Sequence, residues 1–308
     1  MGRANRSLCL TAAVVLALTA TAGADWDESM GHKMHFPQMP DLDGWDVSFW
    51  STHVVPEGFL PEHIIFSHPS GDDWQCSGTG LVSDIHFWVS MQGDTLQSNP
   101  TGEVPFEITW LGVRIRENVL PGEDNGGHTY DYSTPGLQLW SAEYDQTQHV
   151  VSHWATHEQG WFETASGEAV AGDHHHIYQV NIPDTANSLT VTGHTPFEQQ
   201  EGEIYWLQID LEAVRLDGDG NPTEDPVDLG WKTADVDAYP EGSRGAPFMD
   251  VATFYFQTAG LTPEQQGHEM LVIEGVPRDL AFVITPEPAT LALLGLGAVG
   301  LVMRRRRR

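Results

Sequence analysis

The chain has 308 residues, of which 44 are acidic and 14 are basic, so its formal net charge is −30 at pH 7. A field of this sign repels phosphate backbones and anionic lipid surfaces, which argues against nucleic acid as a partner and favours cations and high solubility. Forty per cent of the residues are hydrophobic, which is enough to build a core in a chain of this length.

Residues 1–24 have the layout of a secretory signal peptide. Arg3 and Arg6 form a positive start, residues 8–18 form an apolar run, and Ala22-Gly23-Ala24 forms a small-residue cleavage site. We expect cleavage directly after this triplet. A retained membrane helix is the alternative, but the apolar run is shorter than the about 20 residues that cross a bilayer.

Residues 25–285 then form one mature body, a size that all-β domains reach as single units. The body holds 43 of the acidic residues and seven of the basic ones, which leaves a net charge of −36, and its only lysines are Lys33 and Lys232. Cys76 is its single cysteine, so an internal disulfide is excluded. We expect a solvated acidic surface, with selective cation binding as the more specific alternative.

Alternation of apolar and polar residues with a period of two is the dominant pattern of the body. In residues 80–90, Phe87 and Val89 alternate with His86 and Ser90. Similar patterns occur in residues 104–113, 137–144, 176–182, 203–213, 251–258, 270–275 and 279–285. Clusters rich in Gly, Pro, Asn and Asp separate them, and helix signals are few. We therefore predict an all-β fold, a single antiparallel β-sandwich or jelly-roll-like domain whose strands each have one wet face.

Histidines form two groups that could hold a metal. His149, His153 and His157 are spaced by four residues, which would place neighbours about 6 Å apart on a helix but about 13 Å apart on a strand. The β-branched and aromatic residues between them favour a strand, on which they are too far apart to chelate. His174 and His176 would lie about 7 Å apart on one strand face, where a nearby acid could complete a metal site. Solvated imidazoles at a polar strand end are the alternative.

The loop "DGDGNPTED" is the best candidate for a calcium site. Asp217, Asp219 and Asn221 alternate in a glycine-rich segment and offer the hard oxygen atoms that Ca²⁺ binds. Pro222 stands where an EF-hand loop has its glycine, so the loop is not an EF-hand. An ordinary hairpin turn is the alternative.

The sequence contains no motif of a known catalytic mechanism. A GxSxG nucleophile elbow, a P-loop and an HExxH zinc motif are all missing from it. Exposed aromatic residues could instead build a sugar-binding platform. The tryptophans in or beside the predicted strands are Trp74, Trp88, Trp154, Trp161, Trp206 and Trp231. Because the chain has 11 tryptophans, several of them must be core residues, and the sequence does not show which.

The last 23 residues have three parts. Pro286, Glu287 and Pro288 precede the uncharged segment 289–303, and the five arginines that follow it are Arg304, Arg305, Arg306, Arg307 and Arg308. As a helix, the uncharged segment would span about 22 Å, short of the about 30 Å hydrocarbon core of a bilayer. The arginines would hold it at the cytoplasmic face. We expect a C-terminal hydrophobic helix with transient membrane contact, and a retained anchor is the alternative.

This layout resembles the PEP-CTERM sorting signal of exported proteins in bacteria that have exosortase systems. The resemblance covers residues 286–308 with the Pro-Glu-Pro triplet, the apolar segment and the arginine run, which we term the sorting tail. It implies recognition by an exosortase-type processing enzyme, cleavage near the triplet, and delivery to the cell surface or extracellular matrix. It implies nothing about the activity of the body.

Four segments of the body resemble a domain-of-unknown-function family of bacterial surface proteins: residues 72–90, 201–213, 230–233 and 279–285. The family supplies no catalytic residues. We therefore expect an exported cell-surface or extracellular-matrix protein with a non-enzymatic structural or binding role, the ligand being polysaccharide or calcium. A secreted metal-dependent hydrolase is the alternative.

Overall fold

The computed structural model describes residues 26, 31–49, 70–164, 166–193, 196–235, 251–255 and 267–285. The predicted signal peptide and the sorting tail with its predicted helix lie outside these residues. Within the described ranges every regular element is a β-strand, so the predicted all-β class is confirmed. The same ranges contain no helix that is long and apolar enough to cross a bilayer.

Six strands form a sheet that closes on itself. They are β1 (Trp45–Ser48), β4 (Asp84–Met91), β9 (Val150–Glu163), β10 (Glu168–Ile182), β15 (Leu229–Lys232) and β20 (Phe282–Thr285). The pairings run β10–β9–β1–β15–β4, and β4 pairs with β10 to complete the closed circuit. β20 also pairs with β4. The pairing of β1 with β9 is parallel, and the others in this sheet are antiparallel.

Eight strands form a second, open sheet, in which the described strands pair antiparallel. They are β2 (Ser70–Gln75), β5 (Phe106–Val119), β8 (Thr134–Asp145), β11 (Thr190–Thr192), β13 (Ile204–Leu216), β14 (Pro222–Pro226), β16 (Thr253–Tyr255) and β17 (His268–Met270). The order is β11–β8–β5–β13–β2–β16–β17, and β14 pairs with β13.

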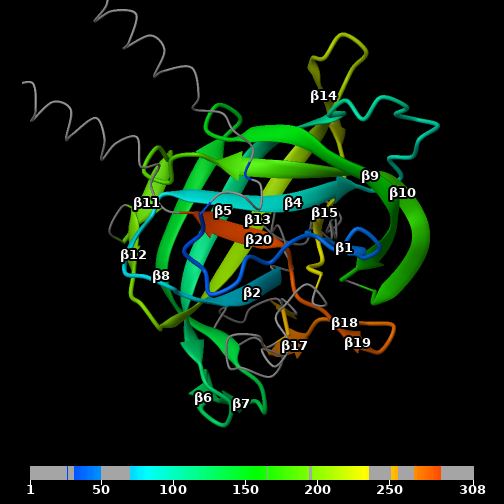
Figure 1. Cartoon of the computed structure of the whole chain (residues 1–308). Coiled ribbons are helices and arrows are strands. Elements are labelled where there is room, and N and C mark those ends of the chain that lie inside the picture. The colour runs from blue at the N-terminus through cyan, green and yellow to red at the C-terminus, as the bar shows by residue number, and fades with distance from the viewer. Residues whose placement is uncertain are drawn as a thin grey trace, which may run out of the picture.

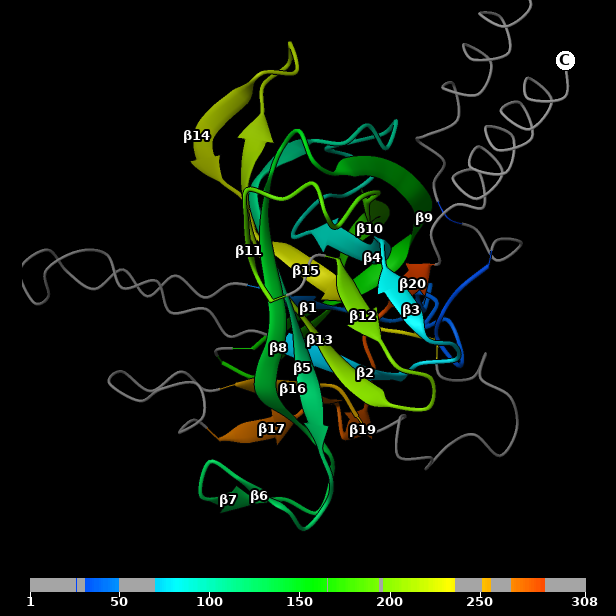
Figure 2. The ribbon, with the colours of Figure 1, turned by 90° about the vertical axis from the view of Figure 1, so that its left-hand side faces the viewer.

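Three short strand pairs lie outside the two sheets. They are β3 (Gly80–Val82) with β12 (Phe197–Gln199), β6 (Asp124–Asn125) with β7 (His128–Thr129), and β18 (Val272–Ile273) with β19 (Val276–Pro277). In Figure 1, β4 and β9 run across the long strands β5 and β13 of the open sheet. Figure 2 shows the hairpin of β14 and the pair β6–β7 projecting from opposite ends of the body.

A chain of aromatic rings joins the two sheets across a common core. Trp231 of β15 packs against Phe282 of β20 with ring centroids 6.2 Å apart, and Phe282 packs edge-on against Trp74 of β2 at 6.0 Å. Trp74 continues to Tyr205 of β13 at 5.4 Å. Buried apolar residues of both sheets belong to one hydrophobic cluster. Such ring pairs add stability beyond the area that they bury, because edge and face carry opposite partial charges.

The prediction of one wet face for each strand is wrong for β4. His86 and Ser90, expected to face water, are buried, as is Trp88 on the same face. Two neighbours cover this face: Trp26 lies 6.4 Å from the rings of His86 and Trp88, and Trp154 of β9 packs edge-on against Trp88 at 5.3 Å. The alternation of apolar and polar residues shows which side chains share a face of β4. That both faces of β4 are covered follows only from the closed pairing of the sheet.

Candidate functional site

A set of charged side chains lies sealed inside the closed circuit. Asp46 of β1 and Lys232 of β15 stand directly opposite each other in the antiparallel register, which places their side chains on one face of the sheet. His174 of β10 reaches the same place from the other side. Asp46, His174 and Lys232 are fully buried. We call these three residues together with Asp173, whose side chain is partly exposed, the buried ion network.

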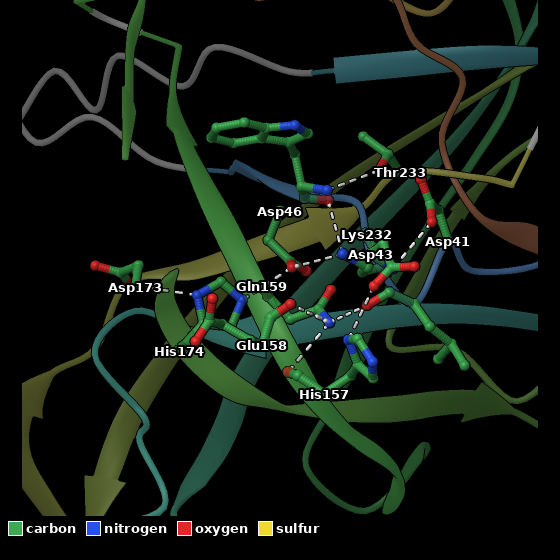
Figure 3. Close-up of polar contacts among 12 residues, drawn as sticks. Asp41, Asp43, Asp46, His157, Glu158, Gln159, Asp173, His174, Lys232 and Thr233 are labelled. Atoms are coloured by element: carbon green, nitrogen blue, oxygen red, sulfur yellow. Dashed lines mark hydrogen bonds and ion pairs between the residues drawn. The ribbon is translucent and has the colours of Figure 1, made fainter. Parts of the chain in front are cut away.

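Asp46 is the centre of the buried ion network (Figure 3). Its Oδ2 atom lies 2.9 Å from His174 Nε2 and 3.2 Å from Lys232 Nζ. The other ring nitrogen of His174, Nδ1, lies 3.2 Å from Asp173 Oδ2, and Lys232 Nζ also donates to the carbonyl oxygen of Trp45 at 3.3 Å. With the ring protonated, two carboxylates face two cations. The network is then electrically balanced, which a buried set of charges requires.

The pKa directions of Asp46 and His174 favour their charged forms, whereas that of Lys232 does not. Burial alone would raise the pKa of Asp46, but the Lys232 ammonium and the His174 ring outweigh burial, and the pKa is lowered. Burial also opposes charge on His174, yet its hydrogen bonds to Asp173 and Asp46 raise the pKa above the usual value. Burial lowers the pKa of Lys232, against the pull of Asp46. The charge of each group is therefore stabilised by its neighbouring charged residues and not by solvent.

The sequence pointed to His174 as a candidate ligand, but not to Asp46 or Asp173. Asp46 carries no motif, and its partners come from positions 174 and 232. One signal was present: Lys232 is one of only two lysines in the chain and sits among apolar residues in "LGWKTA". A lysine is almost never fully buried without a partner. The segment around Lys232 therefore predicts an acidic partner for the lysine, but the sequence does not identify that partner.

The structure gives the two predicted metal-binding histidines of β10 different surroundings. His174 belongs to the buried ion network, whereas His176 Nε2 lies 2.7 Å from the carbonyl oxygen of Asn99. The pairing of β10 with β9 shifts register between these two residues, so the regular alternation assumed in the prediction is interrupted. Among the described residues the two rings share no hydrogen-bond partner.

The strand predicted around the other three histidines is confirmed as β9. His149 precedes the strand and is buried, and burial is the main cause that lowers its pKa. His157 is exposed and lies 3.3 Å from Asp43. His153 Nε2, in contrast, lies 3.3 Å from His176 Nδ1 on the neighbouring strand. The structure therefore pairs one histidine from each of the two groups.

The loop between β13 and β14 carries Asp217, Asp219 and Asn221 on the surface. The Oδ1 atom of Asp217 accepts hydrogen bonds from the backbone N–H groups of Asp219, at 2.9 Å, and Asn221, at 2.8 Å. These bonds are the main causes that lower the pKa of Asp217. Among the described residues no group of three or more His, Cys, Asp or Glu side chains is arranged to hold a metal ion. Calcium binding at this loop stays a prediction.

Most of the tryptophans considered for a sugar platform are core residues. Of the six, the five that are fully buried are Trp74, Trp88, Trp161, Trp206 and Trp231. Trp154 is partly buried and packs against the core. The expectation that several tryptophans are core residues is confirmed, and these five cannot belong to a sugar platform, because a ring without exposed surface cannot stack on a sugar.

Comparison with known families places the body and the tail separately. A family model described as domain of unknown function (DUF7901) matches residues 34–285. The chain belongs to the DUF7901 family. A second model, the PEP-CTERM protein-sorting motif, matches residues 285–308. No curated protein and no solved structure matches the chain.

The two matches confirm both resemblances found in the sequence. The sorting motif identifies this DUF7901 protein as one that is exported, directed to the cell surface and processed by an exosortase. The sorting residues Pro286, Glu287, Pro288 and Arg304 to Arg308 lie outside the described residues. The buried ion network lies wholly within the DUF7901 match.

Proposed function

We propose that this DUF7901 protein is a non-enzymatic component of the cell surface or extracellular matrix, with a structural or binding role. The observation that carries the proposal is the sealing of Asp46, His174 and Lys232. These are the residue types of an acid–base site, but each charge is neutralised by a neighbour and withdrawn from solvent. A substrate could not touch them without displacing the residues that cover them, because none of the three has exposed surface. The network therefore supports stability of the closed circuit rather than catalysis.

Calcium is the better supported of the two proposed ligands. The body carries 43 acidic and seven basic residues, a net charge of −36, and Asp219 lies on an exposed hairpin beside Asp217 and Asn221. Such a surface attracts divalent cations. Polysaccharide binding has less support, because the tryptophans beside the strands are largely used in the core.

The location is tested by following the protein in its own cells. We expect the processed chain in the surface fraction, without Arg304–Arg308 when its C-terminal peptide is read by mass spectrometry. Substituting Pro286, Glu287 and Pro288 together by alanine should leave an unprocessed chain in the membrane fraction. An intact arginine run on the surface protein would contradict cleavage, and the retained anchor would then be the correct interpretation.

The non-enzymatic role is tested against the alternative of a metal-dependent hydrolase. The purified protein is assayed on surface polysaccharides and peptides, once after chelation and once with zinc or manganese added. We expect no metal-dependent turnover. Asp43→Asn is the control, because Asp43 lies on the surface beside exposed His157. Hydrolysis that is lost in His176→Gln but retained in this control would refute the proposal.

A further inference from the structure

Three donor atoms from β9 and β10 meet at the surface of the closed circuit. His153 Nε2 lies 3.3 Å from His176 Nδ1, and the hydroxyl oxygen of Thr156 lies 3.1 Å from the first and 3.3 Å from the second. The three atoms thus form a nearly equilateral triangle. Around a tetrahedral metal ion with bonds of about 2.0–2.1 Å, neighbouring ligand atoms are about 3.3 Å apart. The edges of the triangle are close to this spacing.

The ring of His176 is oriented as a metal ligand. Its Nε2 atom faces the carbonyl oxygen of Asn99 at 2.7 Å, so Nε2 carries the proton and Nδ1 presents a lone pair to the triangle. A backbone carbonyl that holds the distal N–H in this way is the usual outer partner of a metal-bound histidine. His176 is buried, so the direction of the lone pair is fixed by packing.

The ring of His153 faces the triangle with its Nε2 atom, opposite His176 Nδ1. A single hydroxyl hydrogen on Thr156 can satisfy one of the two facing ring nitrogens at a time. One cation would satisfy both of them together.

The space beside the triangle is kept open by a glycine. Gly102 has a φ angle of +69°, and a Cβ atom added there would lie 2.8 Å from His153 Nε2 and 3.2 Å from His176 Nδ1. The side chains of His153 and Thr156 are exposed, so an ion can enter from solvent and keep water as a further ligand. Asp94, bound to the Tyr178 hydroxyl at 2.5 Å, adds negative charge that acts on His153.

We propose that His153, His176 and Thr156 form a surface site for a divalent transition-metal ion of the copper and zinc class. Imidazole nitrogens prefer such ions, and copper binds tighter than zinc to a given set of ligands. The site joins one histidine from each of the two groups seen in the sequence. It is separate from the Asp217 loop, whose oxygen atoms suit calcium. It does not rest on the proposed structural role, because metal binding and hydrolysis are measured separately.

Copper reports directly on the number of bound imidazoles. The purified full chain is stripped with chelator and titrated with Cu²⁺, and the electron paramagnetic resonance spectrum is recorded after one equivalent. We expect hyperfine structure from two nitrogen ligands, competition by Zn²⁺, and no displacement by millimolar Ca²⁺. A spectrum with oxygen ligands only, or displacement by Ca²⁺, would place the ion on the acidic surface and overturn the proposal.

Two variants assign the ligands. His153→Gln should bind Cu²⁺ at least about tenfold more weakly and show one nitrogen at most, since even an outer partner of a metal ligand is worth about 10- to 100-fold. Because the ring of His153 is exposed, we expect the variant to fold, and an unchanged melting temperature verifies this. His157→Gln is the matched control, because His157 is exposed on the same strand and pairs with Asp43. An unchanged spectrum in His153→Gln would refute the site.

Discussion

Asp46 and Lys232 are paired twice, once by backbone register and once by charge. They are direct partners in the antiparallel pairing of β1 with β15, and Lys232 Nζ lies 3.2 Å from Asp46 Oδ2 with neither side chain exposed. Asp46 is also the carboxylate that faces His174 Nε2. Removing this one side chain therefore leaves two buried cations without their common partner.

We predict that Asp46→Asn lowers the free energy of unfolding by about 3–5 kcal/mol, the range for removing one member of a buried ion pair. Urea denaturation at pH 7 measures the change. Asp43→Asn is the control: its carboxylate and its partner His157 are largely exposed, and loss of such a surface pair changes stability by about 1 kcal/mol or less. Equal effects of the two substitutions would mean that the buried ion network does not stabilise the fold.

We expect the stability of the fold to depend on pH through His268 of β17. Its Nε2 atom lies 3.3 Å from Asn125 Nδ2, and burial, together with Arg116 and His128, lowers its pKa from 6.5 to about 4. The unfolded chain therefore takes up a proton near pH 6.5, whereas the folded chain does so only near pH 4. Between these values the unfolded state binds more protons, so stability is lost as the pH falls.

The shift of His268 corresponds to about 3 kcal/mol between pH 6.5 and pH 4. We predict that His268→Gln removes this part of the pH dependence, although the variant starts from lower stability at pH 7. Denaturant midpoints at pH 7, 6, 5 and 4.5 give the slope for each protein. Parallel slopes in parent and variant would show that His268 protonates equally in both states.

Gly160 of β9 allows close packing on Trp45 of the parallel neighbour β1. A Cβ atom at Gly160 would overlap the Trp45 ring, and Gly160 has no left-handed backbone requirement that would confuse the interpretation. We predict that Gly160→Ala lowers the free energy of unfolding by about 1–3 kcal/mol, as overpacking does. Gly78→Ala is the control, since nothing lies within 4 Å of its added Cβ. Thermal unfolding of both variants tests the difference.

Calcium binding at the exposed hairpin has a measurable consequence for melting. A ligand that binds only the folded state raises the melting temperature in a concentration-dependent way. We predict such a rise for the parent protein in millimolar Ca²⁺ and its loss in Asp217→Asn/Asp219→Asn. The same scan in millimolar Mg²⁺ separates site binding from general screening of the acidic surface. No shift in the parent would refute the calcium hypothesis.

The amino-acid sequence by itself determined the class of the fold and the destination of the protein. Alternation of apolar and polar residues predicts β-strands. The alternating segments 80–90 and 203–213 correspond to strands of the structure. The spacing of His149, His153 and His157 indicated a strand rather than a chelating helix, and β9 confirms it. The sorting tail could be identified from the sequence because its three parts are adjacent in the chain.

Only the tertiary structure decided which polar residues are buried and which meet. Pairing of β4 with β10 closes the first sheet and covers the face of β4 that carries His86 and Ser90. The alternating sequence pattern had predicted that this face is exposed to solvent. The same closure brings Asp46, His174 and Lys232 together from distant positions. A register shift in β10 then gives His174 and His176 separate partners. The period of two predicts on which side of a strand each side chain lies. Which strands pair depends on contacts between segments far apart in the sequence, and a local pattern does not predict these contacts.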